Sequence, residues 1–205
     1  MYCTLITGPM FSGKTTKLVG KLEKYVLAKK HIAWFEPKMD DRGGSHESTT
    51  SLRMKELKES PYVHSFQIEK PEEIFSLLKD NWVDPECIFI DEFFMIPFKR
   101  QFFYDYNASK YSKIPLVFAG IIYSWSAELF PTSIEILPFM DAIEKDVAIC
   151  MKCGKPAQYS YYSGDTGDFN GKKSVIDHGQ YSCLCADCYM KKTKKPLEVL
   201  KNMGC

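Results

Sequence analysis

The sequence lacks any apolar run that approaches the ~20 residues needed to cross a membrane as a helix. Met1 leads directly into the first expected strand, without the basic and then apolar leader of a secreted protein. Internal repeats are also absent, which argues against a solenoid or a repeat array. We therefore expect a cytoplasmic protein that has no membrane partner.

The sequence also lacks an excess of charge of either sign. Its 27 Lys and Arg residues nearly balance its 26 Asp and Glu residues, which leaves a formal net charge of +1. Such a balance gives no general reason for attraction to nucleic acid. The basic run at residues 191–195 contains no aromatic residues, so we interpret it as a solvated helix end. We expect no nucleic-acid partner.

A glycine-rich motif stands near the start of the chain. Residues 8–15 fit the phosphate-binding pattern G-x-x-x-x-G-K-[ST] at every required position. A strand pattern at residues 2–7 precedes the motif, and Leu18 and Leu22 begin a helical pattern after it. The glycines let backbone N–H groups face a triphosphate, while the lysine adds a positive charge and the threonine hydroxyl binds Mg²⁺. The motif predicts a nucleotide-binding loop made of Gly8, Pro9, Met10, Phe11, Ser12, Gly13, Lys14, Thr15 and Thr16.

Strand and helix patterns alternate through the next hundred residues. Strands are expected at residues 31–35, 62–66, 87–90 and 114–119, the first of them stopping before Pro37. Helices are expected at residues 50–59, from Pro71 onward, and within residues 94–111. This alternation predicts an α/β fold, with a mainly parallel sheet flanked by helices on both faces. The composition changes near Asp146, so we expect one domain at residues 1–146 and a second at residues 147–205.

Two acids, Asp91 and Glu92, directly follow the apolar strand at residues 87–90. In phosphoryl-transfer folds an Asp in this position approaches Mg²⁺, and a following Glu can take a proton from the nucleophile. Alone, the pattern would favour two solvated acids after a core strand. The nucleotide-binding motif upstream favours a catalytic pair instead.

Four of the eight cysteines form two C-x-x-C pairs, Cys150 with Cys153 and Cys185 with Cys188. The chain is too large for a secreted disulfide mini-protein, and each short turn aims two thiolates at one point, as tetrahedral Zn²⁺ requires. We predict a structural zinc site, with free buried thiols as the alternative. Cys183 stays open as a substitute ligand.

Together these motifs resemble the zinc-containing type II thymidine kinases over nearly the whole chain. Residues 8–16 read G-P-M-F-S-G-K-T-T, and the family's loop reads G-P-M-F-S-G-K-[ST]-T. The other matches are to the family's D-x-R and [ST]-H loop, its D-E strand end and its zinc unit, at Asp40, Arg42, Ser45, His46, Asp91, Glu92, Cys150, Cys153, Tyr181, Cys185 and Cys188.

The resemblance implies a P-loop, RecA-like fold whose small zinc-binding domain carries a lasso loop over the substrate. It implies transfer of the γ-phosphate of ATP, with Mg²⁺, to the 5′-hydroxyl of thymidine or a related pyrimidine deoxynucleoside for DNA-precursor synthesis. Glu92 would be the general base, Arg42 would stabilise the charge that develops, and Thr15 and Asp91 would hold Mg²⁺. His46 is a weaker candidate than Arg42 for closing over the site. Members of the family are typically homotetramers, so a homotetramer is expected.

The residues expected to face the nucleobase depart from the family pattern. Phe93, Phe94 and Met95 stand where the family has Ala-Gln-Phe, and residues 120–125 read G-I-I-Y-S-W where it has G-L-D-x-x-F. By position, the resemblance implies substrate contacts from Met10, Met95, Ile121, Trp125, Phe130 and Tyr181. A preference for a pyrimidine deoxynucleoside other than thymidine stays open.

Two alternatives from other classes of protein also stay open. In a nucleic-acid-stimulated P-loop ATPase, Glu92 would activate water, but the chain is short and nearly neutral. In a non-catalytic binding or regulatory module the altered base-facing residues would reflect lost activity. The intact Lys14, Arg42, Asp91 and Glu92 argue against that second alternative.

Overall fold

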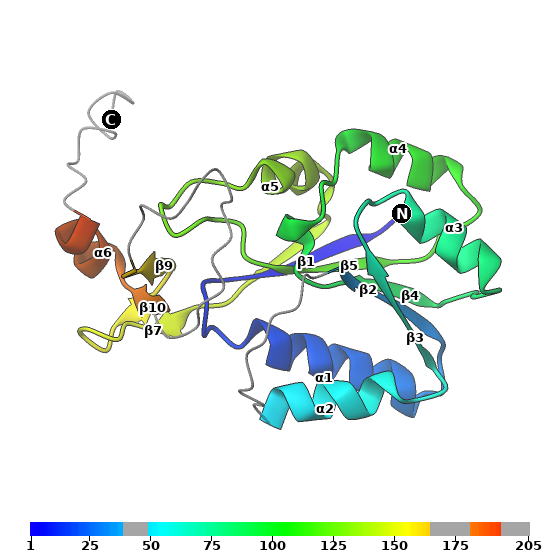
Figure 1. Ribbon diagram of the computed structural model, residues 1–205, viewed down its shortest axis with the longest axis horizontal. Helices are drawn as coiled ribbons and strands as arrows, with labels where there is room; N and C mark the ends of the chain where they lie inside the picture. The colour runs from blue at the N-terminus through cyan, green and yellow to red at the C-terminus, as the bar shows by residue number, and fades with distance from the viewer. Residues whose placement is uncertain (39–48, 165–180, 194–205) are drawn as a thin grey trace.

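The computed structural model describes residues 1–38, 49–164 and 181–193. Its centre is a six-stranded sheet with the strand order β3-β2-β4-β5-β1-β6, in which every neighbouring pair is parallel (Figure 1). The strands of this sheet are β1 (Cys3–Thr7), β2 (Ile32–Pro37), β3 (Val63–Ile68), β4 (Cys87–Ile90), β5 (Leu116–Gly120) and β6 (Ala142–Lys145). The expected α/β fold with a mainly parallel sheet is confirmed.

Helices cover both faces of the sheet. On one face lie α1 (Lys14–Leu27) and α2 (Thr49–Lys58), and on the other lie α3 (Glu73–Asp80), α4 (Arg100–Ala108) and α5 (Pro131–Ile136) (Figure 1). Each face has its own apolar cluster, and the four inner strands β1, β2, β4 and β5 are buried on both sides. Trp34 of β2 and Phe89 of β4, for example, are fully buried and stack with ring centroids 5.9 Å apart. Burial on both faces explains why these strands are almost continuously apolar. No described helix is long and apolar enough to span a bilayer.

Two elements differ from the sequence prediction at their ends. β2 continues through Pro37, although the strand was expected to stop before it. Because β4 pairs only with residues 32–35, β2 has a single partner at Pro37, where the missing N–H group costs little. α3 begins at Glu73, two residues after the expected start at Pro71. A tighter turn comes first, in which the N–H of Ile74 bonds to the oxygen of Pro71 at 3.1 Å.

Two elements beside the site had not been predicted. β6 is an edge strand whose side chains alternate between half-buried and exposed, so its four residues show no apolar run. α5 has Pro131 in its first turn and only six residues, which is too short for a helical period to be visible in the sequence.

The chain after β6 forms a separate group of small elements, residues 148–164 and 181–193, which we call the C-terminal unit. It lies beyond the carboxyl ends of the β1 and β6 strands (Figure 1). Its elements are β7 (Ala148–Ile149), β8 (Pro156–Ala157), β9 (Tyr159–Tyr162), β10 (Tyr181–Leu184) and α6 (Ala186–Thr193), with β7 antiparallel to β8 and β9 antiparallel to β10. A third apolar cluster holds them together.

Candidate active site

The predicted nucleotide-binding loop, residues 8–16, begins directly after β1 and includes the first residues of α1, and we call it the G-K-T loop. Gly13 precedes α1 with φ 84°, a left-handed conformation that glycine adopts at little cost. A Cβ on Gly8 would lie 2.5 Å from the main-chain oxygen of Asp146 and 2.6 Å from Oγ of Ser12. The first turn of α1 carries no acidic residue, so the positive end of the helix dipole faces the loop unopposed. The local geometry therefore explains why glycine occupies both of these motif positions.

Two hydroxyl groups at this loop find no hydrogen-bond partner among the described residues. They belong to Thr7, at the end of β1, and to Ser12, and the oxygen atom of each is buried. An unpaired buried polar group costs about 1–3 kcal/mol, so such groups are expected where a bound ligand completes them. The loop is therefore suited to a polar ligand such as a phosphate group.

Lys14 belongs to the G-K-T loop and interacts electrostatically with the acids that follow β4. Its Nζ donates a hydrogen bond to the main-chain oxygen of Pro9 at 2.7 Å. Burial lowers the pKa of Lys14, while the negative charges of Glu92 and Asp91 act in the opposite direction. The fold thus brings the lysine of the loop within electrostatic reach of both acids, which are more than seventy residues away in the sequence.

The two acids have unusual surroundings. Glu92 has φ 46° and ψ 39°, a left-handed conformation that costs a non-glycine residue about 1 kcal/mol or more. Its N–H donates to Oδ1 of Asp91 at 2.9 Å. Burial, and then the charge of Glu92, raise the pKa of Asp91 to about 7. A divalent cation beside Asp91 would favour the ionised form. Backbone strain and a perturbed carboxyl group are both typical of catalytic sites.

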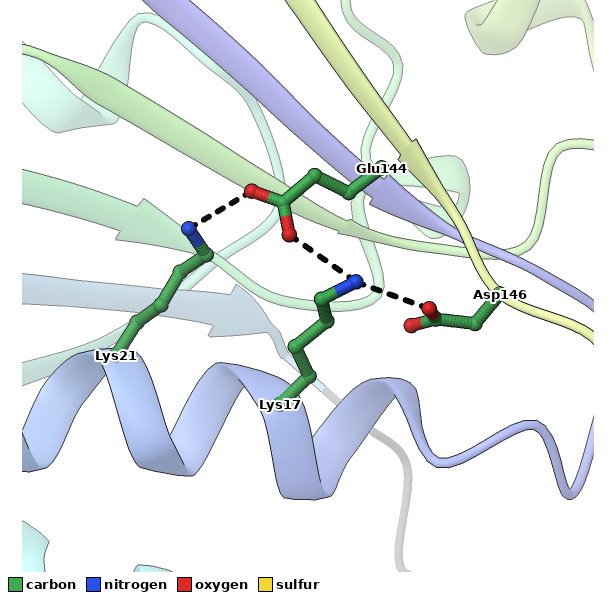
Figure 2. A network of polar contacts seen from close by, with 4 residues as sticks. All are labelled: Lys17, Lys21, Glu144 and Asp146. Carbon is green, nitrogen blue, oxygen red and sulfur yellow. Dashed lines mark hydrogen bonds and ion pairs between the residues drawn. The ribbon is translucent and has the colours of Figure 1, made fainter.

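An ion-pair network ties the start of α1 to the end of β6 (Figure 2). Lys17 Nζ lies 3.1 Å from Glu144 and 2.9 Å from Asp146, and Lys21 Nζ lies 2.8 Å from Glu144. The N–H of Asp146 bonds to the main-chain oxygen of Thr7 at 2.7 Å, directly before the G-K-T loop. Hydrogen bonds from Lys21 and Lys17 lower the pKa of Glu144 against the opposing effect of burial. The network fixes α1, and so the loop, against the edge strand.

Aromatic side chains fill the space beside the acids. Phe93 and Phe94 follow Glu92 in the short 3-10 helix η1 (Phe93–Met95), and Phe94 packs on Phe130 with ring centroids 4.8 Å apart. A Cβ on Gly120 would lie 3.0 Å from Phe93 and 3.1 Å from Phe94. The residues that replace the family's Ala-Gln are therefore packed under the end of β5, and Met95 after them is half-buried. Phe130 and Met95 thus lie at the same end of the sheet as Glu92.

A shallow cleft adjoins the G-K-T loop on the side of residues 121–123. Its lining residues come from β1, the loop, the segment after β5, β6 and the C-terminal unit: Thr7, Gly8, Pro9, Ile121, Ile122, Tyr123, Lys145, Gln158 and Ser160. The cleft places Ile121, a predicted substrate residue, beside the loop.

Trp125 and Tyr181 meet through the C-terminal unit. The ring of Tyr162 lies 6.4 Å from that of Trp125 and 5.0 Å from that of Tyr181. The hydroxyl of Tyr189 also donates to the main-chain oxygen of Trp125 at 2.8 Å. Two predicted substrate residues, far apart in the sequence, therefore share one aromatic cluster.

The four paired cysteines converge on one point. Ligand atoms of Cys150, Cys153, Cys185 and Cys188 all lie within 4.8 Å of one another, and the Cys153 and Cys185 sulfurs are 3.6 Å apart. Four thiolates at 2.3 Å from a tetrahedral Zn²⁺ would be separated by about 3.8 Å, so the cluster fits this metal. The two C-x-x-C turns contain equivalent hydrogen bonds. The N–H of Gly154 donates to the main-chain oxygen of Cys150, and the N–H of Tyr189 donates to that of Cys185, each at 2.9 Å.

Within this cluster, the Cys150 thiol has a lowered pKa. Burial acts to raise that pKa, but hydrogen bonds from the backbone of Cys185, Lys152 and Cys153 outweigh burial and lower it to about 6. Cys183, the substitute ligand left open by the sequence, lies outside the cluster. Its thiol donates to the main-chain oxygen of Met10 instead.

Comparison with known proteins decides the family. The sequence profile described as thymidine kinase matches residues 1–189 of the chain. The chain belongs to the thymidine kinase family. Thymidine kinases similar to it include those of Pseudothermotoga lettingae (29% identity over 201 residues, 94% of this chain and 96% of the relative), Mesoplasma florum (29% over 189 residues, 90% and 89%) and Thermococcus kodakarensis (29% over 161 residues, 78% and 77%).

Several residues that the thymidine kinase resemblance singled out lie outside the described part of the chain. They are Asp40, Arg42, Ser45 and His46, together with residues 165–180, which include most of the expected lasso. The roles assigned to these residues stay predictions.

Other residues at this thymidine kinase site were missed by sequence reasoning. Asp146 was noted only as a change in composition, and neither Lys17 nor Ser160 was considered. Lys17 lies one helical turn after Lys14, on a helix already expected there, so spacing along α1 could have pointed to it. No signal in the sequence indicates Ser160, because its partner at the site is 150 residues away.

Proposed function

We propose that the protein transfers the γ-phosphate of ATP to the 5′-hydroxyl of thymidine or of a related pyrimidine deoxynucleoside. The observation that supports this proposal is that the strained Glu92 and Asp91 lie within electrostatic reach of Lys14, in the G-K-T loop of a member of the thymidine kinase family. Phosphoryl transfer requires donors for phosphate and a base close together, and we assign these roles to the G-K-T loop with Lys14 and to Glu92.

Each group has one task in this reaction. The backbone of the G-K-T loop and Lys14 bind the phosphates of ATP, and Thr15 and Asp91 would provide oxygen ligands for Mg²⁺. When bound, Mg²⁺ neutralises charge on the phosphates. Glu92 accepts the proton of the 5′-hydroxyl as that oxygen attacks, and Arg42, by the family resemblance, stabilises charge on the transferring group.

The nucleobase is held by residues from three parts of the chain. We assign its contacts to Met10, Met95, Ile121, Trp125, Phe130 and Tyr181. At Phe93, Phe94, Met95 and Trp125 the sequence departs from the family pattern. A one-group change in a pocket alters discrimination by about 1–3 kcal/mol, so the preferred pyrimidine base has to be measured.

We propose that the four clustered cysteines hold a structural Zn²⁺ and that residues 147–205 form a second domain on the ATP-binding domain, residues 1–146. We also propose a homotetramer in the cytoplasm, on the strength of the family resemblance. Light scattering during gel filtration tests the assembly, and a monomer mass would contradict it.

The deciding experiment is a phosphotransfer assay with Mg²⁺ and ATP on the purified, zinc-loaded protein. The panel contains thymidine, deoxyuridine, deoxycytidine and 5-substituted deoxyuridines, with a control that has no nucleoside and a second control with DNA. We expect a 5′-monophosphate product from at least one pyrimidine deoxynucleoside, and the order of kcat/KM identifies the base.

The other outcomes are equally clear. ATP consumption without nucleoside, increased by DNA, would show a P-loop ATPase and would contradict the proposal. Absence of any ATP consumption, with ATP still bound, would show a non-catalytic binding module. If thymidine is not the best substrate, the kinase assignment stands and its base preference is corrected.

A further inference from the structure

The main chain of Met10, in the middle of the G-K-T loop, is bonded on both sides by the C-terminal unit. Its N–H donates to Oγ of Ser160 at 3.0 Å, and its oxygen accepts a hydrogen bond from the thiol of Cys183. Ser160 lies on β9 and Cys183 on β10, and the two residues are direct partners in the antiparallel register. Two residues that pair across β9 and β10 therefore form hydrogen bonds with both main-chain polar groups of Met10. We call this pair of hydrogen bonds the grip on the loop.

Ser160 and Cys183 are themselves fixed in position by burial and hydrogen bonding. Cys183 is fully buried and Ser160 is 7% exposed. The main-chain oxygen of Cys183 accepts a bond from the N–H of Met151, at 2.9 Å, inside the first C-x-x-C turn. The Met10 side chain packs on the apolar cluster of the C-terminal unit. The position of Met10 thus follows from the fold of that unit, not from β1 or α1 alone.

This grip determines which loop groups are available for phosphate. Pro9 has no N–H, its oxygen accepts the bond from Lys14, and both main-chain groups of Met10 are used. The loop then turns sharply, with left-handed conformations at Phe11 (φ 61°) and Gly13 (φ 84°). The N–H groups that bind phosphate must therefore come from the part of the loop after Met10. The hydrogen bonds of Met10 fix the direction in which the chain enters the turn at Phe11.

We propose that Ser160 and Cys183 are positioning residues that hold the G-K-T loop in its ATP-binding conformation, so that the C-terminal unit controls affinity for the triphosphate. This inference rests on the proposed function, since it assigns the G-K-T loop to ATP. A positioned loop does not have to lose conformational freedom when ATP binds, so affinity is higher than for a loose loop.

The test compares Ser160→Ala and Cys183→Ala, which remove one bond each, with Ser160→Thr and Cys183→Ser, which keep a donor or acceptor at the same place. Met151→Ala is the matched control, because this exposed side chain belongs to the same unit and the variant keeps its N–H. For every variant we would measure the Kd of ATP by calorimetry, the zinc content, the thermal midpoint, and KM and kcat in the phosphotransfer assay.

We expect Ser160→Ala to raise the Kd and KM for ATP by roughly 3- to 10-fold, the loss typical of one hydrogen bond. Cys183→Ala should have a smaller effect in the same direction, since a thiol is a weak donor. The Thr and Ser variants should return ATP affinity to within about twofold of the parent, and Met151→Ala should leave it unchanged. A purely structural role would lower the active fraction, and so kcat, without changing the Kd of the molecules that remain folded.

Three results would overturn the inference. The first is unchanged ATP affinity in both alanine variants. The second is equal weakening in the alanine variants and in those that keep the polar atom. The third is weakening only in step with loss of zinc or of the folded state. Should Cys183→Ala fail to fold, Ser160→Ala against Ser160→Thr decides alone. If the parent transfers no phosphate, the proposed function fails, while the calorimetric comparison still tests the grip on the loop.

Discussion

The ammonium group of Lys14 donates a hydrogen bond to the main-chain oxygen of Pro9, five residues earlier in the same loop, at 2.7 Å. The lysine is thus satisfied by its own loop when no phosphate is present. Burial lowers the pKa of Lys14, and the negative charges of Glu92 and Asp91 oppose that effect. A bound phosphate would compete with the Pro9 oxygen for the ammonium group.

Replacing Lys14 should therefore weaken ATP binding more than it weakens the fold. We expect Lys14→Met to raise the Kd of ATP by roughly 10- to 100-fold, as for the loss of a hydrogen bond to a charged group. Lys24→Met, at an exposed position in the last turn of the same helix, is the control. Isothermal calorimetry gives both values, and equal affinities in the two variants would remove Lys14 from the ATP site.

Glu92→Gln should separate catalysis from binding. The substitution keeps the size of the side chain but removes the proton acceptor, so we expect kcat to fall by about 2–4 orders of magnitude while the Kd of ATP changes little. Glu59→Gln, at an exposed position after α2, controls for the loss of one negative charge. Single-turnover transfer rates are the measurement, and a rate equal to the parent's would exclude Glu92 as the base.

Gly120 and Gly20 should respond oppositely to alanine. A Cβ at Gly120 would press on Phe93 and Phe94, so we expect Gly120→Ala to lower the free energy of unfolding by about 1–3 kcal/mol. At Gly20, inside α1, a Cβ would meet nothing within 4 Å. Gly20→Ala should therefore raise the free energy of unfolding by about 0.5–1 kcal/mol. Urea titration measures both, and destabilisation of similar size in the two variants would contradict the packing described at Gly120.

Cys153→Ser should release the metal that the cysteine cluster is proposed to hold. Loss of one thiolate leaves three ligands, so we expect about one zinc ion per chain in the parent and a strongly reduced content in the variant. The thermal midpoint should fall with it, because metal binding and folding of the C-terminal unit are linked. Lys152→Ala, in the same turn, is the control. Elemental analysis that finds no zinc in the parent protein would end the proposal.

The ion pairs of Glu144 predict a dependence of stability on pH. Lys21 and Lys17 depress its folded-state pKa, so its contribution is present above its unfolded pKa of about 4.5 and is lost as the pH falls through the lower folded value. The parent should exceed Glu144→Gln in stability at pH 7 by an amount on the order of 1 kcal/mol or less. This difference should shrink below about pH 4.5 and at high salt. A difference that is independent of pH would show that the network contributes no charge-dependent stability.

Local patterns carried the sequence prediction a long way. Residues close together in the sequence encode the strand, loop and helix around residues 8–16. The same is true of the two C-x-x-C turns and of the alternation of strands and helices that predicts a parallel sheet. The fold class, the family and the convergence of the four cysteines are confirmed. The catalytic and substrate roles of Glu92, Arg42 and the base-facing residues stay predictions.

The prediction failed where a long-range neighbour decides the local structure. Pro37 continues β2 because β4 is shorter than β2 and leaves that position with one partner. β6 forms because β1 offers an open edge, although four half-exposed residues carry no periodic signal of their own.

By itself, the sequence determined the chemical groups of this protein and their order, because glycine turns, apolar periods and paired cysteines act over a few residues. Only the tertiary structure decided which of those groups meet. Lys14 comes within electrostatic reach of Glu92 because β1 and β4 end at the same edge of the sheet, and Ser160 and Cys183 bind the main chain of Met10 because β9 pairs with β10 beside the loop. These contacts join residues 78, 150 and 173 positions apart, and no local pattern encodes such pairs.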